Sequence, residues 1–323
     1  MNTVKFFICP MSKNIVDSVI ELNSPYLGLL PTRRQIDFNG GYVNSWTTKD
    51  FSNYVKSKNQ NIILERDHSG ANQGTNEDNG NYSHIIDSNY FDIIHLDPWK
   101  KYENFEQGLF EIISNIDTIF GLNNRVKFEI GTEEDIRKFE TSDLIYMLEF
   151  FKKNLSESKF KQIEYLVIQS GVSLDLVNKK NIGVFDEARL KDMLEICNNY
   201  NLKSKEHNGD YMSVDLIREK FNLGLDSINI APEFGYLQTC AILENLDEEK
   251  IELFYNLCYK FGKWQKWVDA DFVPEKNKQD LIKISGHYVY SHPEFLLNIH
   301  DEKYLPSINE KINKKLGELN DIL

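Results

Sequence analysis

Side chains able to bind a metal or move a proton follow several short apolar runs of this sequence. Asp67 and His68 come after one such run, Glu133 after another and His207 after a third. If these runs are parallel strands of one barrel, their C-terminal ends meet on one face, where barrel enzymes carry their active sites. Polar groups gathered on one face cost free energy unless they are used, so this face is the candidate site.

The residue types are typical of a divalent-metal site. Imidazole nitrogens and carboxylate oxygens bind zinc and similar cations, so His68, His207 and a carboxylate are candidate ligands. The metal would polarise a carbonyl or an enediolate, while Asp67 or Glu133 moves protons. Zinc is expected, with manganese, nickel or cobalt as alternatives. Other polar residues at the same strand ends are candidates for substrate binding: Thr32, Arg33, Gln35, Asp97, Gln169, Ser170 and Asp210.

The elements that must position these residues alternate along the chain. Apolar β-branched runs, as expected of parallel strands covered on both faces, alternate with stretches of helical period. We expect strands at residues 4–9, 26–30, 61–64, 91–96, 125–130, 163–169, 202–206 and 227–231. We expect helices at residues 14–22, 49–57, 105–120, 143–154, 186–200, 214–221 and 236–246. The pattern predicts an α/β fold, a (β/α)8 TIM barrel over residues 1–246.

Capping residues and two irregular regions complete this prediction. Thr47, Ser142 and Ser213 have the side chains of helix N-caps, and Gly224 suits a helix C-terminus. Residues 69–89 are rich in Gly, Asn and Asp without a helical period, so we expect a lid, a binding loop or a mobile loop. We expect residues 247–323 to form a helical C-terminal extension, packed on the barrel or used in oligomerisation.

Composition argues against several functions. The chain has 323 residues, 41% of them hydrophobic, which is enough to bury a core. Its 50 acidic and 37 basic residues give a formal charge of −13, so we expect no nucleic-acid binding. The sequence contains no run of 18 apolar residues, so we expect no membrane span. The four scattered cysteines are typical of reduced thiols, and we expect a cytoplasmic protein.

A series of segments in order resembles one family of barrel proteins. The segments are PTRRQIDFNGGYVNSWTTKDF, IILERDHSGANQG, IIHLD, IGTE, VIQSGV, KEHNGDY and INIAPEFG. They resemble the so-called non-catalytic subunit of class II tagatose-bisphosphate aldolase, a family that also contains tagatose 6-phosphate 4-epimerases. The resemblance covers residues 4–246 and, more faintly, residues 267–292. It implies a TIM barrel related to class II aldolases that acts on phosphorylated ketoses or assists a partner that does.

The resemblance also implies roles for single residues. It implies His68 as a metal ligand and Asp67 as the acid or base, with His207 where a later metal-binding histidine is expected. Glu133 matches the family's Gly-Thr-Glu segment. Residues in matching positions that we expect to contact the substrate are Thr32, Gln35, Asn72 and Asp97.

Several residues depart from the family pattern. Glu65 and Arg66 stand where relatives have small residues, and Arg33 with Arg34 replaces a small polar pair. Extra arginines beside the site can grip a different anion, either a carboxylate or a phosphate. Glu233, in contrast, would repel a phosphate at that helix start. We therefore expect a sugar phosphate or an acidic sugar as the substrate.

These features together predict a divalent-metal-dependent carbohydrate enzyme. His68, His207 and Glu133 hold the metal, Asp67 or Glu133 removes a hydroxyl proton, and a C–C bond breaks to give an enediolate. Re-addition on the other face gives epimerisation, and product release gives retro-aldol cleavage. The alternative hypothesis is a non-catalytic subunit that stabilises a class II aldolase partner, and a homo-oligomer is also open.

Some of these residues can instead have purely structural roles. Asp67 and His68 can form a pair that ties the long loop to the barrel, and Arg33 can be a surface charge. Glu129 can point outward from its strand. We expect His95, inside an apolar strand, to be a core residue whose ring nitrogens have partners.

Overall fold

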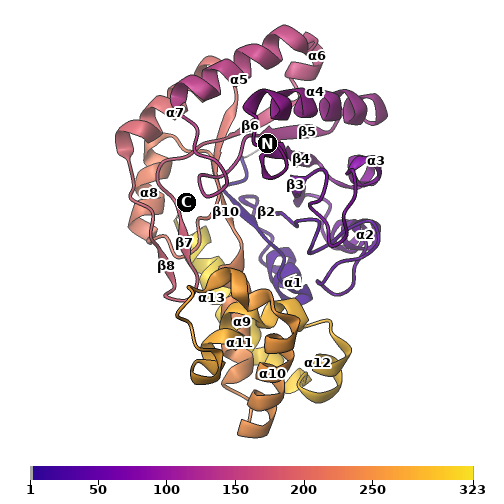
Figure 1. Cartoon of the computed structure of the whole chain (residues 1–323), viewed down its shortest axis with the longest axis vertical. Coiled ribbons are helices and arrows are strands. Elements are labelled where there is room, and N and C mark those ends of the chain that lie inside the picture. Colours follow the sequence, from indigo (N-terminus) through magenta and orange to yellow (C-terminus); the bar gives the residue numbers. More distant parts are fainter. Residues whose placement is uncertain (1–2, 323) are drawn as a thin grey trace.

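The computed structural model describes residues 3–322, which form a closed barrel of eight parallel strands. Around the ring the strands follow chain order, and β10 pairs back onto β1 (Figure 1). The barrel strands are β1 (Phe6–Ile8), β2 (Leu27–Leu29), β3 (Ile63–Ser69), β4 (Ile93–Leu96), β5 (Lys127–Ile130), β6 (Ile163–Val167), β9 (Lys203–Glu206) and β10 (Ser227–Ile230). The predicted TIM barrel and its eight strands are confirmed.

Strand β3 is longer than expected and carries Asp67 and His68 within it. The prediction ended at residue 64 because charged residues follow, yet β3 is buried from Leu64 to Ser69. Side chains alternate between the two faces of a strand. Arg66 accordingly points outward and pairs with Asp87 at 3.0 Å, with both side chains fully buried. The next residue, Asp67, faces the site.

Helices surround the barrel on its outside. They are α1 (Lys13–Leu22), α2 (Thr48–Lys58), α3 (Asn81–Tyr90), α4 (Phe105–Leu122), α5 (Thr141–Asn154), α6 (Glu157–Phe160), α7 (Glu187–Asn199), α8 (Val214–Leu223) and α9 (Pro232–Leu243). Thr47 and Ser213 cap α2 and α8 as predicted, and Gly224 ends α8 at a φ of 113°. Ser142 is not a cap, because Glu140 precedes α5 and forms a capping box with Asp143.

A helix and a small sheet are among the elements that occur where none was expected. Residues 69–89 were predicted as one long loop, but α3 begins at Asn81. Its buried residues are polar, namely Ser83, His84, Asp87 and Ser88, so no hydrophobic period marks the helix. The buried ion pair between Arg66 and Asp87 holds it against the barrel instead. A small antiparallel sheet, β7 (Leu174–Asp175) with β8 (Lys180–Asn181), follows β6.

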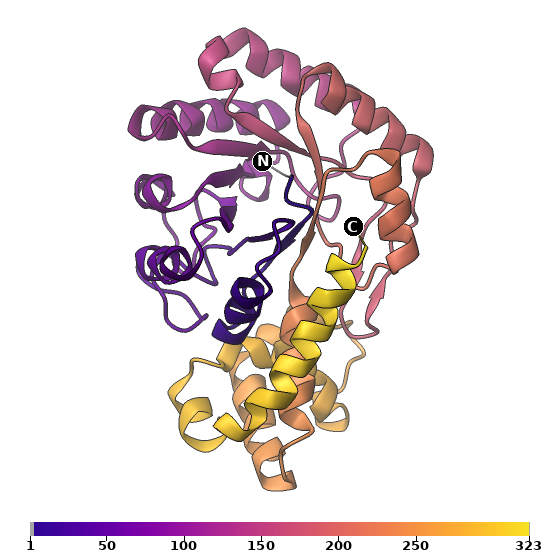
Figure 2. The same ribbon diagram turned by 180° about the vertical axis from the view of Figure 1, so that it is seen from behind.

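The chain after α9 forms a C-terminal helical segment (residues 248–320). Its helices are α10 (Glu248–Phe261), α11 (Lys278–Ser285), α12 (Pro293–Asn298) and α13 (Leu305–Asn320). Figure 2 shows α13 running back from this segment along the barrel, and it contacts α9 and α1. The residues that α13 buries are Ile308, Ile312, Leu316 and Leu319. Among residues 3–322, no helix has the length and apolar character needed to cross a membrane.

This packing predicts that the helical segment and the barrel unfold together. Ile312 is fully buried, so Ile312→Ala should lower the free energy of unfolding by about 2–5 kcal/mol, measured by urea denaturation. The exposed neighbour Asn313, changed to Ala, should shift it by less than about 0.5 kcal/mol. Two separate transitions, of which only one responds to Ile312→Ala, would show instead that the segment is an independent domain.

Candidate active site

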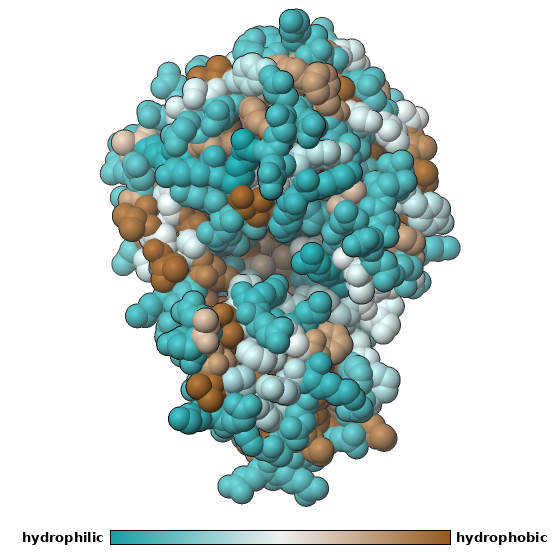
Figure 3. Space-filling model, viewed as in Figure 1, coloured by the Kyte–Doolittle hydropathy of each residue, from teal (hydrophilic) through white to brown (hydrophobic). Residues whose placement is uncertain are grey.

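A cavity of about 270 Å³ opens at the C-terminal ends of the barrel strands. Six of the predicted site residues line it: Thr32, Gln35, Asp67, His68, Glu133 and His207. The lining also includes residues from loops, from β10 and from the helical segment, among them Arg34, Lys100, Asn229, Lys266, Trp267 and Tyr288. Figure 3 shows a hollow near the middle of this face, above the helical segment, with a mostly hydrophilic rim.

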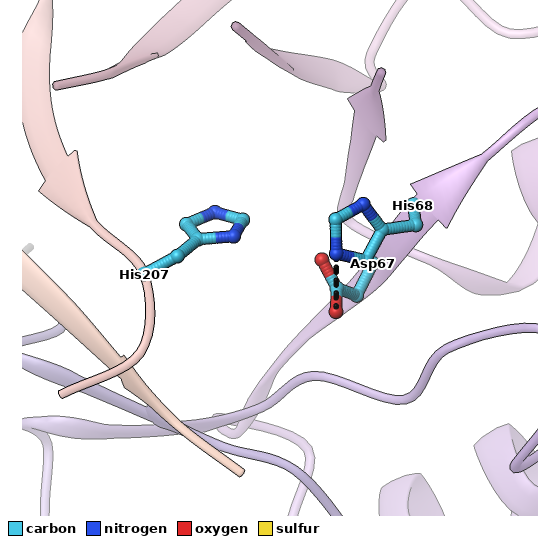
Figure 4. A group of neighbouring side chains, drawn as sticks. All are labelled: Asp67, His68 and His207. Atoms are coloured by element: carbon cyan, nitrogen blue, oxygen red, sulfur yellow. Dashed lines mark ion pairs between the residues drawn. The ribbon is translucent and has the colours of Figure 1, made fainter. Parts of the chain in front are cut away.

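The two histidines face each other across a gap, with Asp67 beside His68 (Figure 4). Asp67 and His68 belong to β3, and His207 directly follows β9. One ligand atom from each of the three residues lies within 4.8 Å of the others. Glu133 Oε2 lies 3.7 Å from His68 Nε2 and 3.4 Å from His207 Nδ1. The structure thus places all the predicted metal-binding and proton-moving residues together.

A buried carboxylate holds each imidazole by its other ring nitrogen. His68 Nδ1 lies 2.9 Å from Asp97 Oδ2, and His207 Nε2 lies 2.6 Å from Glu129 Oε1. Asp97 and Glu129 are buried behind the histidines. Asp97 was predicted to bind substrate, but it acts here on His68. Glu129 points into the barrel and not outward. Such carboxylate–histidine pairs fix the tautomer and the orientation of metal-binding imidazoles.

The residues therefore fit a divalent cation with nitrogen and oxygen ligands. His68 Nε2 and His207 Nδ1 are the ring nitrogens that face Glu133. Glu133 retains 16% of its side-chain exposure, so the group is open towards the cavity. An open side is what distinguishes a catalytic metal site from a closed structural one. His68 also has a φ of 42°, which is uncommon for a residue other than glycine and is typical of functional sites.

The carboxylates of the group attract positive charge, either a proton or a metal ion. Although burial opposes it, hydrogen bonds to Glu129 and Glu133 raise the pKa of His207 well above its usual range. Conversely, and again against burial, the facing imidazole of His68 lowers the pKa of Asp67. His68 and His207 also lower the pKa of Glu133, to about 2. Asp67 and Glu133 are therefore ionised at neutral pH and attract cations, and a metal ion would displace the proton of His207.

A buried lysine completes a chain of charges behind His207. Lys205 Nζ lies 2.5 Å from Glu65 Oε2 and also contacts Glu129, and all three side chains are fully buried. The ammonium group lies 3.8 Å from the centre of the Phe7 ring. Although burial opposes it, Lys205 lowers the pKa of Glu129 and keeps that carboxylate ionised. Lys205 thereby fixes the charge that holds His207.

His95 lies beside this chain of charges. Its Nδ1 is 3.2 Å from Asp67 Oδ1, and its Nε2 is 3.1 Å from the carbonyl oxygen of Gly131. Both nitrogens therefore have partners, as expected for a core residue. His95 also forms a second possible ligand group with Glu129 and His207, whose ligand atoms lie within 4.8 Å of one another. This deeper group is fully buried and competes with the cavity group as a metal site.

Six predicted substrate-binding residues do not line the cavity, among them Arg33 and Asn72. Arg33 is 1% exposed, and its guanidinium lies 2.5 Å from Asp78 and 2.7 Å from the carbonyl oxygen of Gly70. It ties the loop after β3 to the barrel. Arg33 is therefore a structural residue, and its prediction as a substrate contact is wrong. Asn72 is exposed, and its side chain accepts a hydrogen bond from the backbone of Asp78. Arg34, the next residue in the chain, lines the cavity instead.

Gln169, Ser170 and Asp210 are buried outside the cavity lining. Gln169 braces the loop after β5 through three hydrogen bonds to its backbone. Ser170 accepts a hydrogen bond from the buried Lys220 at 2.7 Å. Asp210 accepts hydrogen bonds from backbone amides at the start of α9, and burial together with Glu233 raises its pKa to about 7. These three residues therefore support the walls of the site.

Lys205 and Asn229 were not predicted from the sequence as site residues. Asn229 lines the cavity while 4% exposed, and neither polar atom of its amide has a hydrogen-bond partner in the described part of the chain. Lys205 lies in β9 and Asn229 lies in β10, and alternation along each strand places every second side chain inside the barrel. The signal for Lys205 and Asn229 in the sequence was therefore a charged or amide side chain at an inward-facing position of a barrel strand.

Comparison with known proteins shows similarity in fold. No family model and no curated protein matches the sequence. A solved structure described as a probable tagatose 6 phosphate kinase from Sinorhizobium meliloti 1021 matches with a TM-score of 0.82 and 14% identity, over 99% of this chain and 100% of that chain. The predicted barrel architecture is therefore shared by a solved protein over its whole length.

Two further solved structures share the fold. A fructose-bisphosphate aldolase from Campylobacter jejuni matches with a TM-score of 0.62 and 14% identity, over 99% of this chain and 90% of that chain. A fructuronate-tagaturonate epimerase from Cohnella laeviribosi matches with a TM-score of 0.61 and 11% identity, over 99% of this chain and 81% of that chain. The chain thus has a fold that sugar aldolases and a sugar epimerase also use.

The buried charge chain predicts a large cost for removing its lysine. Lys205→Met leaves the buried Glu129 without its counter-charge and the buried Glu65 without its hydrogen-bond donor. It should lower the free energy of unfolding by about 3–5 kcal/mol, measured by urea denaturation. Lys203→Met, at a half-exposed position in the same strand, should cost no more than about 1 kcal/mol. Adding Glu65→Leu to Lys205→Met should restore part of the loss. Equal costs for the two lysines would contradict this account.

Proposed function

We propose that this protein is a divalent-metal-dependent enzyme that acts on a sugar phosphate or a related ketose by epimerisation or retro-aldol cleavage. The observation that carries the proposal is the pair of cavity imidazoles, each fixed by a buried carboxylate and both facing Glu133. The fructose-bisphosphate aldolase and the fructuronate-tagaturonate epimerase that share the fold are named for sugar substrates, which supports a sugar as the substrate.

The residues of the site divide between binding and proton transfer. His68, His207 and Glu133 would hold the metal, and zinc is the ion that we expect. When bound, the cation supplies Lewis acidity towards the carbonyl and a neighbouring hydroxyl of the substrate. Asp67 remains for proton transfer: its Oδ1 faces His95 at 3.2 Å, and its Oδ2 lies 3.7 Å from His68.

Proton transfer to Asp67 starts the proposed reaction. The carboxylate, ionised at neutral pH, accepts the proton of the hydroxyl on the carbon β to the substrate's carbonyl. The O–H electron pair forms a new carbonyl, the bond between the α and β carbons breaks, and its electrons give an enediolate. Rotation of the new carbonyl and re-addition, with return of the proton, give the epimer. Protonation of the enediolate and release of both fragments complete retro-aldol cleavage.

The metal-binding proposal predicts near-stoichiometric divalent metal in protein purified without chelator or affinity metal. His68→Ala and His207→Ala should each lose this metal, because each variant removes one ring nitrogen from the ligand group. Elemental analysis measures the content. His300→Ala is the matched control, since His300 is exposed and lies outside the cavity lining, and it should retain the metal.

One result would contradict the metal-binding proposal. Wild-type protein that contains no metal, and whose unfolding temperature does not rise when zinc or manganese is added, does not bind these ions. In that case the hypothesis of a non-catalytic subunit, tested by co-purification with an aldolase, would replace it.

The unpaired amide of Asn229 predicts opposite effects on stability and activity. A buried polar group without a hydrogen bond costs about 1–3 kcal/mol, so Asn229→Leu should leave the free energy of unfolding unchanged or raise it. Turnover of ketose phosphates should fall at least about tenfold, because a substrate hydroxyl would lose its partner. Urea denaturation and turnover measure the two effects. A destabilised variant with full turnover would assign Asn229 a purely structural role.

A further inference from the structure

Three basic side chains line the cavity beside the candidate metal group. Arg34 follows β2, Lys100 ends a 3-10 turn (Pro98–Lys100) after β4, and Lys266 lies in a 3-10 turn (Lys263–Trp267) of the C-terminal helical segment. They come from segments far apart in the sequence. Within residues 3–322, none of the three forms an ion pair. One cavity therefore gathers three positive charges that have no direct carboxylate partner, beside the carboxylates of Asp67, Glu133 and Asp135.

This grouping costs free energy in the absence of a ligand. Like charges in one cavity repel each other, and the chain, with a formal charge of −13, has many carboxylates that could have neutralised them. Burial is the largest cause that lowers the pKa of Lys266, to about 8. The charges of Arg34 and Lys100 lower it further, and Glu133 acts in the opposite direction. Positive charges kept close together without counter-charges are typical of a binding site for an anion.

The position of the three cations matches a ligand that also reaches the metal group. Glu133 lines the same cavity, and the charge of Lys100 is among the causes that lower the pKa of Glu133. Lys266 Nζ lies 4.2 Å from the centre of the Trp267 ring and 5.4 Å from that of Tyr288. Both rings line the cavity, so the helical segment offers aromatic surface as well as charge at this end.

We propose that Arg34, Lys100 and Lys266 form an anion subsite, which binds a phosphate or carboxylate at the end of the substrate opposite the reacting carbonyl. The proposal rests on the proposed function for the identity of the reacting end. Arg34 offers a planar fork that can bind two oxygens at once, and the lysines add point charges. Lys266 makes the C-terminal helical segment a part of the site and a determinant of specificity.

Direct binding to metal-free protein tests the subsite without any need for turnover. Isothermal titration calorimetry at low ionic strength, after removal of metal with EDTA, would use inorganic phosphate in one arm and galacturonate in the other. Lys266→Gln and Arg34→Gln should each weaken binding of the preferred anion about tenfold or more. Lys263→Gln is the matched control, because Lys263 lies in the same turn but does not line the cavity, and it should bind as wild type does.

The two arms identify the anion, and the variants separate this proposal from the proposed function. The subsite is supported if wild-type protein binds one of the anions and if Lys266→Gln and Arg34→Gln weaken this binding while Lys263→Gln does not. The anion that binds then identifies the ligand group. No binding in either arm, or equal weakening in Lys263→Gln, overturns it. His68→Ala should keep wild-type anion affinity. Anion binding in a protein without metal affinity would therefore reject the proposed function and leave the subsite standing.

Discussion

Glu129 lies in the barrel interior between the ammonium group of Lys205 and the imidazole of His207, and the candidate site depends on this arrangement. A carboxylate so deeply buried stays charged only because a cation touches it. Glu129 in turn holds one nitrogen of His207 and turns the other towards Glu133. Asp97 does the same for His68 from the opposite side. The barrel interior is thus part of the candidate site as well as of the core.

Away from this buried group, positively charged side chains line the cavity. Carboxylates and imidazoles lie at the ends of the barrel strands, while Arg34, Lys100 and Lys266 line the same cavity from loops and from the C-terminal helical segment. A ligand that suits both parts has oxygens able to bind a cation at one end and negative charge at the other. A phosphorylated or acidic ketose has this form. The packing of α13 on α9 and α1 then has a functional consequence, because it fixes the segment that carries Lys266.

The sequence predicted the barrel and six of the residues that line the cavity, and what it missed has physical causes. Asp67, His68, Glu133 and His207 were predicted because the ends of parallel strands meet on one face. Helix α3 was missed because an ion pair, and not an apolar face, holds it to the barrel. Sequence patterns did not predict where the side chains of residues 33 and 34 point. Arg33 is buried and ties a loop to the barrel, whereas Arg34 is exposed and lines the cavity. Lys205 was missed because charged residues inside a barrel are rare.

In the proposed site, the imidazoles of His68 and His207 and the carboxylate of Glu133 bind one divalent cation at the cavity. Anomalous X-ray diffraction from crystals grown with zinc or manganese tests it most directly. The account predicts one strong anomalous peak within bonding distance of His68 Nε2, His207 Nδ1 and Glu133. The absence of a peak, or a peak in the deeper group of His95, Glu129 and His207, would contradict it.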